Sequence, residues 1–284
     1  MKTQIQSCFV LGKPFAIAAA CLALQSAQAT LLFSEGFNYP AGGLGSNVNP
    51  GNGTTWTGNN NITVDATDPL LTYSGLNNIS VNNLKDVWGV SSGSAANSPA
   101  FASAVTSGQI YYSFLLDITA LPSATGTGSF LTALNPLGAN PNGSSDNLDL
   151  YVNNTGVLTM KTKGVAASSG FTASLNTTYL VVLEYDFGAN LASAYFDPSS
   201  SSFGGSTPTA FATATSTASY AGFDDVGFKA AATSTSTTGT FLVNNLLVGT
   251  TWANVTPVAT PEPATIALSG LGLIGLALAR RMRR

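Results

Sequence analysis

The chain has 284 residues, of which only 8% are charged, against roughly 25% in ordinary soluble proteins. It contains no histidine, which excludes the Ser-His-Asp triad, the Cys-His pair and the commonest zinc ligand. The segment 31–256 carries twelve acidic residues and four lysines, a net charge of -8. A body without a basic surface cannot bind nucleic acid by counterion release, so nucleic acid is excluded as a partner.

Residues 1–29 have the pattern of a secretory signal peptide. Lys2 and Lys13 precede an apolar run at 15–24, and Ala27-Gln28-Ala29 supplies the two small residues of a cleavage site. We therefore predict export through the Sec machinery and cleavage by signal peptidase after Ala29. The alternatives are a buried N-terminal helix and lipidation at Cys21, although Ala18 stands where a lipoprotein signal normally has leucine.

The last residues form three segments in a fixed order. Pro261-Glu262-Pro263 precedes the uncharged stretch 264–279, and an arginine cluster follows, made of Arg280, Arg281, Arg283 and Arg284. Sixteen helical residues reach about 24 Å, and thinning of the bilayer with snorkelling arginines lets such a short helix cross a core of roughly 30 Å. The pattern predicts one short transmembrane helix with the arginines in the cytoplasm and the body outside.

This tail resembles the PEP-CTERM sorting signal, because Pro261, Glu262 and Pro263 match its name-giving motif. The resemblance implies that the tail holds an exported protein in the inner membrane until an exosortase, a membrane cysteine peptidase, processes it at that motif. The expected partners are thus this peptidase and membrane lipid, and the expected destination is the cell surface or the extracellular space. A plain tail anchor that is never cut is the alternative.

Between the two ends, short apolar runs rich in β-branched and aromatic residues alternate with Gly/Ser/Asn/Thr clusters, which is typical of an all-β fold. Residues 109–119 and 179–187 alternate most clearly, so one face of each is expected in the core. Further strands are predicted at Leu31–Phe37, Leu70–Leu76, Phe130–Leu134, Leu148–Asn153, Val157–Lys161, Leu191–Asp197, Phe223–Lys229 and Phe241–Val248. The predicted fold class is an all-β, two-sheet antiparallel jelly-roll sandwich over 30–256, preceded by the signal peptide 1–29 and followed by the sorting segment 257–284.

Two segments of the body resemble concanavalin A-like/LamG-like jelly rolls. Residues 33–39, followed by Trp56, resemble the opening strand, and residues 241–252 resemble the closing strand. The resemblance implies that the first and last strands lie side by side. Asn244 stands where an acidic residue is expected, which puts any ion-binding role of that position in doubt.

Glu184 and Asp186 are the strongest catalytic candidates, because alternation places both carboxylates on one face of a strand. Jelly-roll glycosidases with an E-x-D-x-x-E strand have a second glutamate, but Ala189 occupies that position here. We therefore predict no catalytic residue and no enzyme.

Two kinds of binding residue remain open. Asp146, Asp149, Asp224 and Asp225 offer oxygen ligands of the kind that calcium takes, although their spacing is not that of a calcium loop. Trp56, Trp88 and Trp252 offer rings that could stack on a sugar, although large aromatics usually lie in the core. We predict no cofactor, and calcium at these aspartates is the alternative.

Together these features predict an exported, non-enzymatic protein of the cell envelope or extracellular matrix. The alternative is a lectin-like module that binds a glycan such as an extracellular polysaccharide, and the third interpretation is a polysaccharide-remodelling glycosidase.

Stability of the exported chain should not depend on reductant, because Cys8 and Cys21, the two cysteines of the sequence, both lie in the leader. The melting temperature of the purified mature chain should be the same with and without dithiothreitol. A shift of several degrees would mean that the leader is retained with its cysteines paired.

Overall fold

The structure is a computed structural model that describes residues 30–45, 47–50, 53, 55–58, 62–88, 94–97, 100–123, 125, 128–137, 147–163, 165–167, 169–230 and 239–259. The signal peptide with Ala27 and Ala29, the motif at 261–263, the segment 264–279 and the four C-terminal arginines lie outside these ranges. Within them, no helix is long and apolar enough to cross a membrane.

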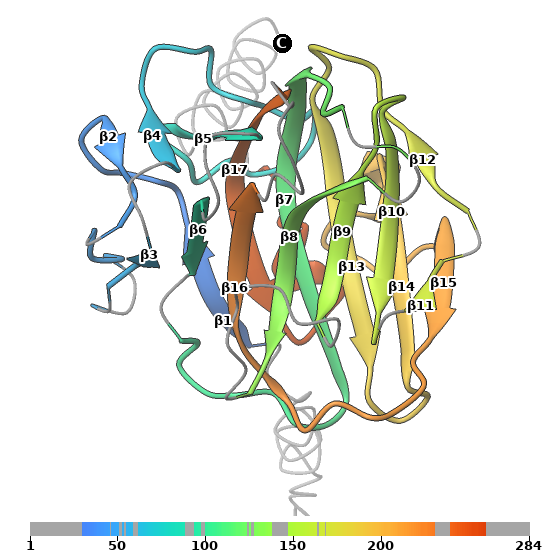
Figure 1. Ribbon diagram of the computed structural model, residues 1–284. Coiled ribbons are helices and arrows are strands. Elements are labelled where there is room, and N and C mark those ends of the chain that lie inside the picture. Colours follow the sequence, from blue (N-terminus) through green and yellow to red (C-terminus); the bar gives the residue numbers. More distant parts are fainter. Residues whose placement is uncertain are drawn as a thin grey trace, which may run out of the picture.

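Two antiparallel sheets pack face to face (Figure 1), as the sequence predicts. The first sheet is ordered β15 (Ala212–Thr215), β14 (Leu191–Phe196), β13 (Tyr179–Asp186), β7 (Gln109–Ala120), β17 (Gly239–Gly249), β5 (Asn83–Trp88), β4 (Thr63–Asp65) and β2 (Gly42–Gly43), with β1 (Leu31–Glu35) also paired to β17. The second is ordered β11 (Val165–Ala166), β10 (Val157–Thr162), β9 (Leu148–Val152), β8 (Ser129–Pro136), β16 (Phe223–Ala230), β6 (Ser94–Asn97) and β3 (Thr57–Gly58), with β12 (Phe171–Thr172) paired to β10.

The first and last strands of the body are neighbours. Leu31 of β1 lies opposite Gly249 of β17, and Glu35 lies opposite Leu246. This pairing agrees with what the concanavalin A-like resemblance implies, and it brings the two ends of the sandwich onto one part of the first sheet.

The central strands follow their predicted alternation. Ile110, Tyr112 and Phe114 of β7 point into the core between the sheets, as do Val181 and Leu183 of β13. The opposite face of the same strands is buried as well, in a second apolar cluster. Each of these strands therefore has two buried faces, and the face that the sequence marks as half polar is covered by other parts of the chain.

One predicted strand is wrong. Leu70–Leu76 forms an irregular segment that covers the outer face of the first sheet, and only Leu76 makes an isolated bridge, to Val258. Its main-chain groups bond to asparagine side chains instead of a neighbouring strand: the Leu71 N–H donates to Asn83 Oδ1 (3.2 Å), and the Leu71 carbonyl accepts from Asn244 Nδ2 (3.0 Å). A short 3-10 turn at Ser200–Ser202 and a four-residue helix, α2 (Trp252–Val255), cover the same face.

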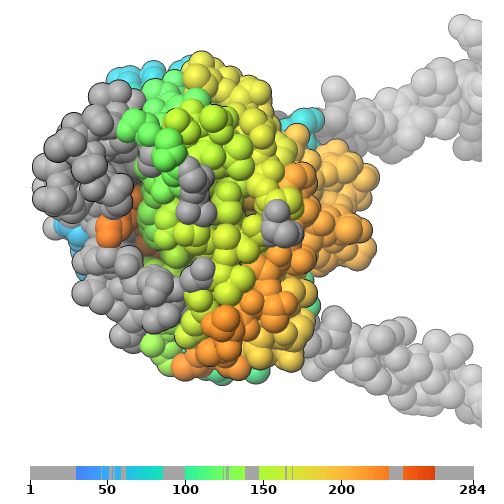
Figure 2. Space-filling view, turned by 45° about the vertical axis from the view of Figure 1, so that its right-hand side comes forward, coloured from blue at the N-terminus to red at the C-terminus, as the bar shows by residue number. Residues whose placement is uncertain are grey.

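The other edge of the sandwich closes where β15 of the first sheet comes beside β10 of the second. Figure 2 shows the β9–β10 hairpin in yellow-green at the middle of this side, with the orange residues around β15 along its edge.

The side chain of Glu35 is the centre of a buried hydrogen-bond cluster. Its carboxylate accepts bonds from the Phe37 N–H (2.7 Å), the Tyr39 hydroxyl (2.5 Å), Asn49 Nδ2 (2.8 Å) and the Trp56 indole N–H (2.9 Å). Burial, reinforced by this carboxylate, raises the pKa of Tyr39. A carboxylate without water is stable only when donors surround it, so these four bonds account for its position.

Replacing Glu35 with alanine should lower the free energy of unfolding by about 3 kcal/mol or more, because each buried donor left without an acceptor costs roughly 1–3 kcal/mol. Urea unfolding followed by tryptophan fluorescence measures the loss. Tyr39→Phe is the matched control, since it removes one donor and leaves the carboxylate satisfied. A Glu35→Ala loss no larger than that of Tyr39→Phe would contradict a central role for the carboxylate.

Candidate functional site

The last described residues of the chain remain bonded to the sandwich, and they come just before the motif at 261–263 in the sequence. The Thr256 carbonyl accepts from the Gly204 N–H (2.9 Å), and the Pro257 carbonyl accepts from the Asn77 N–H (2.8 Å). The Ala259 N–H then donates to the Gly75 carbonyl (3.1 Å). Main-chain contacts with the body thus continue past the predicted domain boundary at 256, almost to Pro261.

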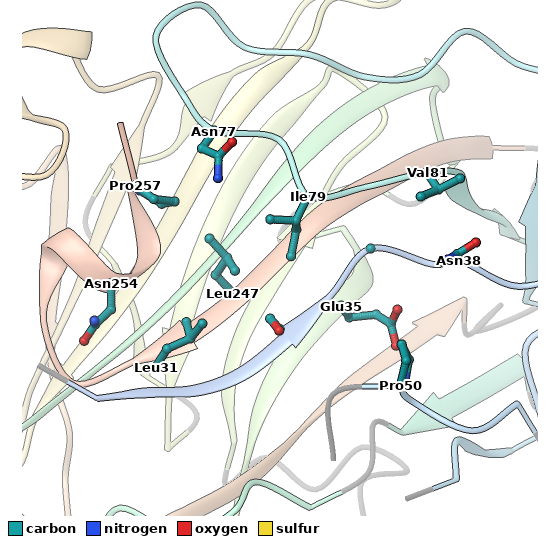
Figure 3. A pocket seen from close by; sticks show the side chains of 12 residues that line it. Leu31, Glu35, Asn38, Pro50, Asn77, Ile79, Val81, Leu247, Asn254 and Pro257 are labelled. Atoms are coloured by element: carbon teal, nitrogen blue, oxygen red, sulfur yellow. The ribbon is translucent and has the colours of Figure 1, made fainter. Parts of the chain in front are cut away.

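A hollow of about 520 Å³ opens beside this exit, on the outer side of β1 and β17. Figure 3 shows side chains from β1, from the segment 77–81 and from the end of the chain around it. Its lining consists of Leu31, Ser34, Glu35, Gly36, Asn38, Pro50, Asn77, Ile79, Val81, Leu247, Asn254 and Pro257.

A bulge in β17 holds one wall of the hollow. The register between β17 and β7 shifts between Asn244 and Leu247, and Asn245 has a φ of 51°, in the left-handed region. This turn directs Asn245 toward the segment 77–81: its Oδ1 accepts from the Ile79 N–H (2.9 Å), and its own N–H donates to the Ser80 hydroxyl (2.5 Å). The bulge therefore fixes the loop that carries Ile79 and Val81.

Gly36 allows the same loop to approach β1. A Cβ atom at Gly36 would lie 2.5 Å from the Ile79 carbonyl oxygen, so the loop lies directly on the glycine backbone. The Val81 N–H also donates to the Gly36 carbonyl (2.9 Å). Only glycine leaves room for this contact, which seats the loop at the rim of the hollow.

The hollow is lined mainly by aliphatic side chains and asparagine amides. Leu31, Ile79 and Val81 are exposed at its rim, and Glu35 is the one charged residue in its lining. The Glu35 side chain is directed toward Pro50 (Figure 3), where its carboxylate is held by the buried donors described above. The hollow is thus suited to contact with an apolar surface and provides no free carboxylate for acid-base chemistry.

Sequence reasoning missed Glu35 and Asn245. An acidic residue on the inward-facing side of a strand, in step with Phe33, was the available signal for Glu35. Nothing in the local pattern marks Asn245, because its role depends on a bulge between two strands distant in sequence.

The two candidate catalytic carboxylates have structural partners. Glu184 is buried and accepts a bond from the Tyr195 hydroxyl. Asp186 accepts from the main-chain N–H groups of Gly188 (2.8 Å) and Ala189 (3.1 Å), which closes the turn after β13. Both side chains lie on the face opposite Tyr185, as alternation requires, and both support the local fold.

Two of the three candidate sugar-binding rings are in the interior, which corrects that hypothesis for them. Trp56 lies between the sheets against Phe37 and Phe228, and its indole N–H donates a hydrogen bond to the Glu35 carboxylate. Trp252 is buried under the first sheet, and its indole N–H donates to the Ser202 carbonyl (2.9 Å). Neither ring has an open face for a sugar. The side chain of Trp88 lies outside the described part of the structure.

The candidate calcium ligands do not gather into a site. Asp146 lies outside the described residues, and the described ones include no group of three His, Cys, Asp or Glu residues able to hold a metal ion. Asp149 is on β9, whereas Asp224 and Asp225 are on β16, with β8 between the two strands. Asp225 is held by Asn135, whose Nδ2 donates to its Oδ1 (2.5 Å).

Asp149 is a buried carboxyl with one unsatisfied oxygen. Its Oδ2 accepts a long bond from the Tyr151 hydroxyl (3.4 Å), and its Oδ1 has no hydrogen-bond partner. Burial raises the pKa of Asp149 from 3.8 to about 7, although Tyr151, Lys161 and Lys229 act in the opposite direction. A pKa of about 7 leaves this carboxyl about half protonated at pH 7, and the proton competes with calcium for it.

Asp149 should make the protein less stable as the pH rises from about 4 to about 7. The folded state keeps the proton in that window while the unfolded chain has lost it, so a pKa of about 7 against 3.8 costs roughly 4 kcal/mol above pH 7. Asp149→Asn should therefore be more stable than the wild type at pH 8 and nearly equal to it at pH 4, by urea unfolding at both values. Tyr151→Phe, which keeps the carboxyl, should retain the pH dependence. Equal slopes with pH in Asp149→Asn and the wild type would contradict the assignment.

Comparison with solved structures returns other β-rich proteins at low identity. The chain is similar to a sialidase, with a TM-score of 0.37 and 13% identity, over 59% of this chain and 15% of that one. It is similar to the receptor binding domain of botulinum neurotoxin D (TM-score 0.44, 12% identity, 86% of this chain and 52% of that one). A cellulose-induced protein matches with a TM-score of 0.42 and 14% identity, over 67% of this chain and 85% of that one.

Comparison with curated proteins finds no match for the chain. A family described as the PEP-CTERM protein-sorting motif matches residues 259–284, which confirms the resemblance found in the tail. The match begins at Ala259, the residue whose N–H bonds to Gly75 at the edge of the sandwich. The chain therefore combines a two-sheet β-sandwich with a segment, residues 259–284, that matches the PEP-CTERM protein-sorting motif.

Proposed function

We propose that this chain is an exported, non-enzymatic protein of the cell envelope or extracellular matrix, sorted through its tail by an exosortase-type peptidase. The observation that carries the proposal is the match of residues 259–284 to the PEP-CTERM motif, which begins at Ala259, a residue whose N–H still bonds to Gly75 of the sandwich. A processing enzyme would find Pro261, Glu262 and Pro263 next to a folded body.

The membrane stage of the proposal rests on the order of the tail segments. The uncharged stretch 264–279 would hold the chain in the inner membrane, and the four arginines after it would remain in the cytoplasm. Cleavage at the motif would release the sandwich to the outside. Signal peptidase, acting at Ala27 and Ala29, would precede this step.

A structural role for the body is supported by three of its carboxylates, which accept hydrogen bonds from other groups of the protein. Glu35 and Glu184 accept bonds from buried tyrosine hydroxyls, and Asp186 closes a turn. Acid-base catalysis needs a carboxyl that can reach a substrate, and these groups are occupied by the protein itself. The enzyme interpretation therefore gains no support from these three carboxyl groups.

Substitutions in the two ends of the tail should have different effects on sorting. Replacing Pro261, Glu262 and Pro263 with alanine leaves the apolar stretch intact, so the full-length chain should accumulate in the inner membrane. Replacing Arg280, Arg281, Arg283 and Arg284 with glutamine removes the charges that fix orientation, so that chain should be mis-inserted or released without processing. Cell fractionation and mass spectrometry of the C-terminus measure both outcomes.

The wild-type chain is the control for processing. In cells that contain the peptidase it should end near the motif, and in cells without the peptidase it should keep Arg284. An uncut wild-type chain that stays in the membrane of cells with the peptidase would mean that the tail is only an anchor.

A further inference from the structure

We infer that the rim of the hollow beside β1 and β17 rests on the lipid surface of the membrane while the tail is still uncut. This docking surface consists of Ile79, Val81, Pro257 and Val258, with Leu31 beside them. The inference rests on the proposed membrane stage of sorting and adds to it a fixed orientation of the sandwich.

The length of the connection to the membrane is the first argument. Ala259 is bonded to Gly75 of the body, and the uncharged stretch begins at Ala264. The five steps from Ala259 to Ala264 span at most about 18 Å when fully extended. The headgroup layer on one side of a bilayer takes up about 5–7 Å of that distance. The face of the sandwich that carries Ala259 is therefore confined to within about 13 Å of the headgroup surface.

That face has exposed apolar side chains where the tail leaves it. Val81 is 58% exposed, Val258 51% and Ile79 37%. Val258 immediately follows Pro257, which lines the hollow together with Ile79 and Val81. Clustered aliphatic side chains gain free energy when they enter the boundary between headgroups and acyl chains.

The distribution of charge favours the same face. Glu35, the one charged residue in the lining, has its carboxylate buried among donors, so no charge has to be removed from water when lipid approaches. Asn77 and Asn254 stand at the rim, where amides can remain hydrated among the headgroups. Other faces carry carboxylates, such as Asp65 and Asp68 around Lys85, and the net charge of the body, -8, is repelled by anionic lipids.

Fluorescence quenching by lipid tests the inference on the mature chain with its tail, which contains no natural cysteine. Single variants Val81→Cys and Ile79→Cys are labelled with an environment-sensitive nitrobenzoxadiazole dye. Leu137→Cys is the matched control, because Leu137 is also exposed, at 47%, and follows β8 of the second sheet. Each chain is reconstituted into phosphatidylethanolamine and phosphatidylglycerol vesicles that contain a nitroxide-labelled lipid.

We expect blue-shifted emission and loss of fluorescence to the nitroxide lipid at positions 79 and 81, and neither at position 137. Equal emission at all three positions in chains that float with the vesicles would overturn the inference and leave the membrane stage intact. A blue shift without quenching would overturn it too, since it would mean that a second copy covers the face. Chains that do not float with the vesicles would overturn both the membrane stage and the inference.

Discussion

The buried carboxylate of Glu35 is the interaction on which the first quarter of the body depends. Among the described residues of 36–58, regular structure is limited to β2 and β3, each two residues long, so strand pairing alone cannot hold them. Glu35 replaces that pairing with bonds to Tyr39, Asn49 and Trp56. Trp56 then packs against Phe37 and Phe228 and joins the two sheets. Dipolar donors, without a cation in the cluster, satisfy the charge.

Elsewhere in the fold, asparagine amides also satisfy buried polar groups. This explains how a fold with so few charged residues can satisfy its buried hydrogen-bonding groups. Asn83 and Asn244 bond to each other and to the covering segment around Leu71. Asn82 donates to the carbonyls of Phe37 and Tyr39. An amide has both donors and acceptors. At Asn244, an acidic residue would lack the donor that both partners need, which explains why an amide stands where the jelly-roll resemblance leads one to expect an acid.

The sequence could predict those features that neighbouring residues determine, but not those that depend on residues far apart in the chain. Long strands such as β7 and β13 show their alternation within one segment, and the tail is defined by the local order of prolines, apolar residues and arginines. Short strands such as β4 and β15 have too few residues to show a period. The apolar and aromatic residues of Leu70–Leu76 predict a strand, yet asparagines from other segments bond to the main chain of Leu71. Trp56 and Trp252 could not be placed without the partners that bury them, and the hollow depends on a bulge in β17 opposite a distant loop.

The pairing of β1 with β17 also bears on the export that is proposed for this chain. Thr30 and Thr250 are hydrogen-bonded across 220 positions of sequence. The first strand of the body therefore cannot pair until almost the last strand is available. Contacts this distant form slowly, and the first sheet stays incomplete until almost the whole body has passed. In the proposed export, the part of the chain still inside the translocon is unfolded. This topology would therefore delay closure of the sandwich until only the sorting tail is left inside.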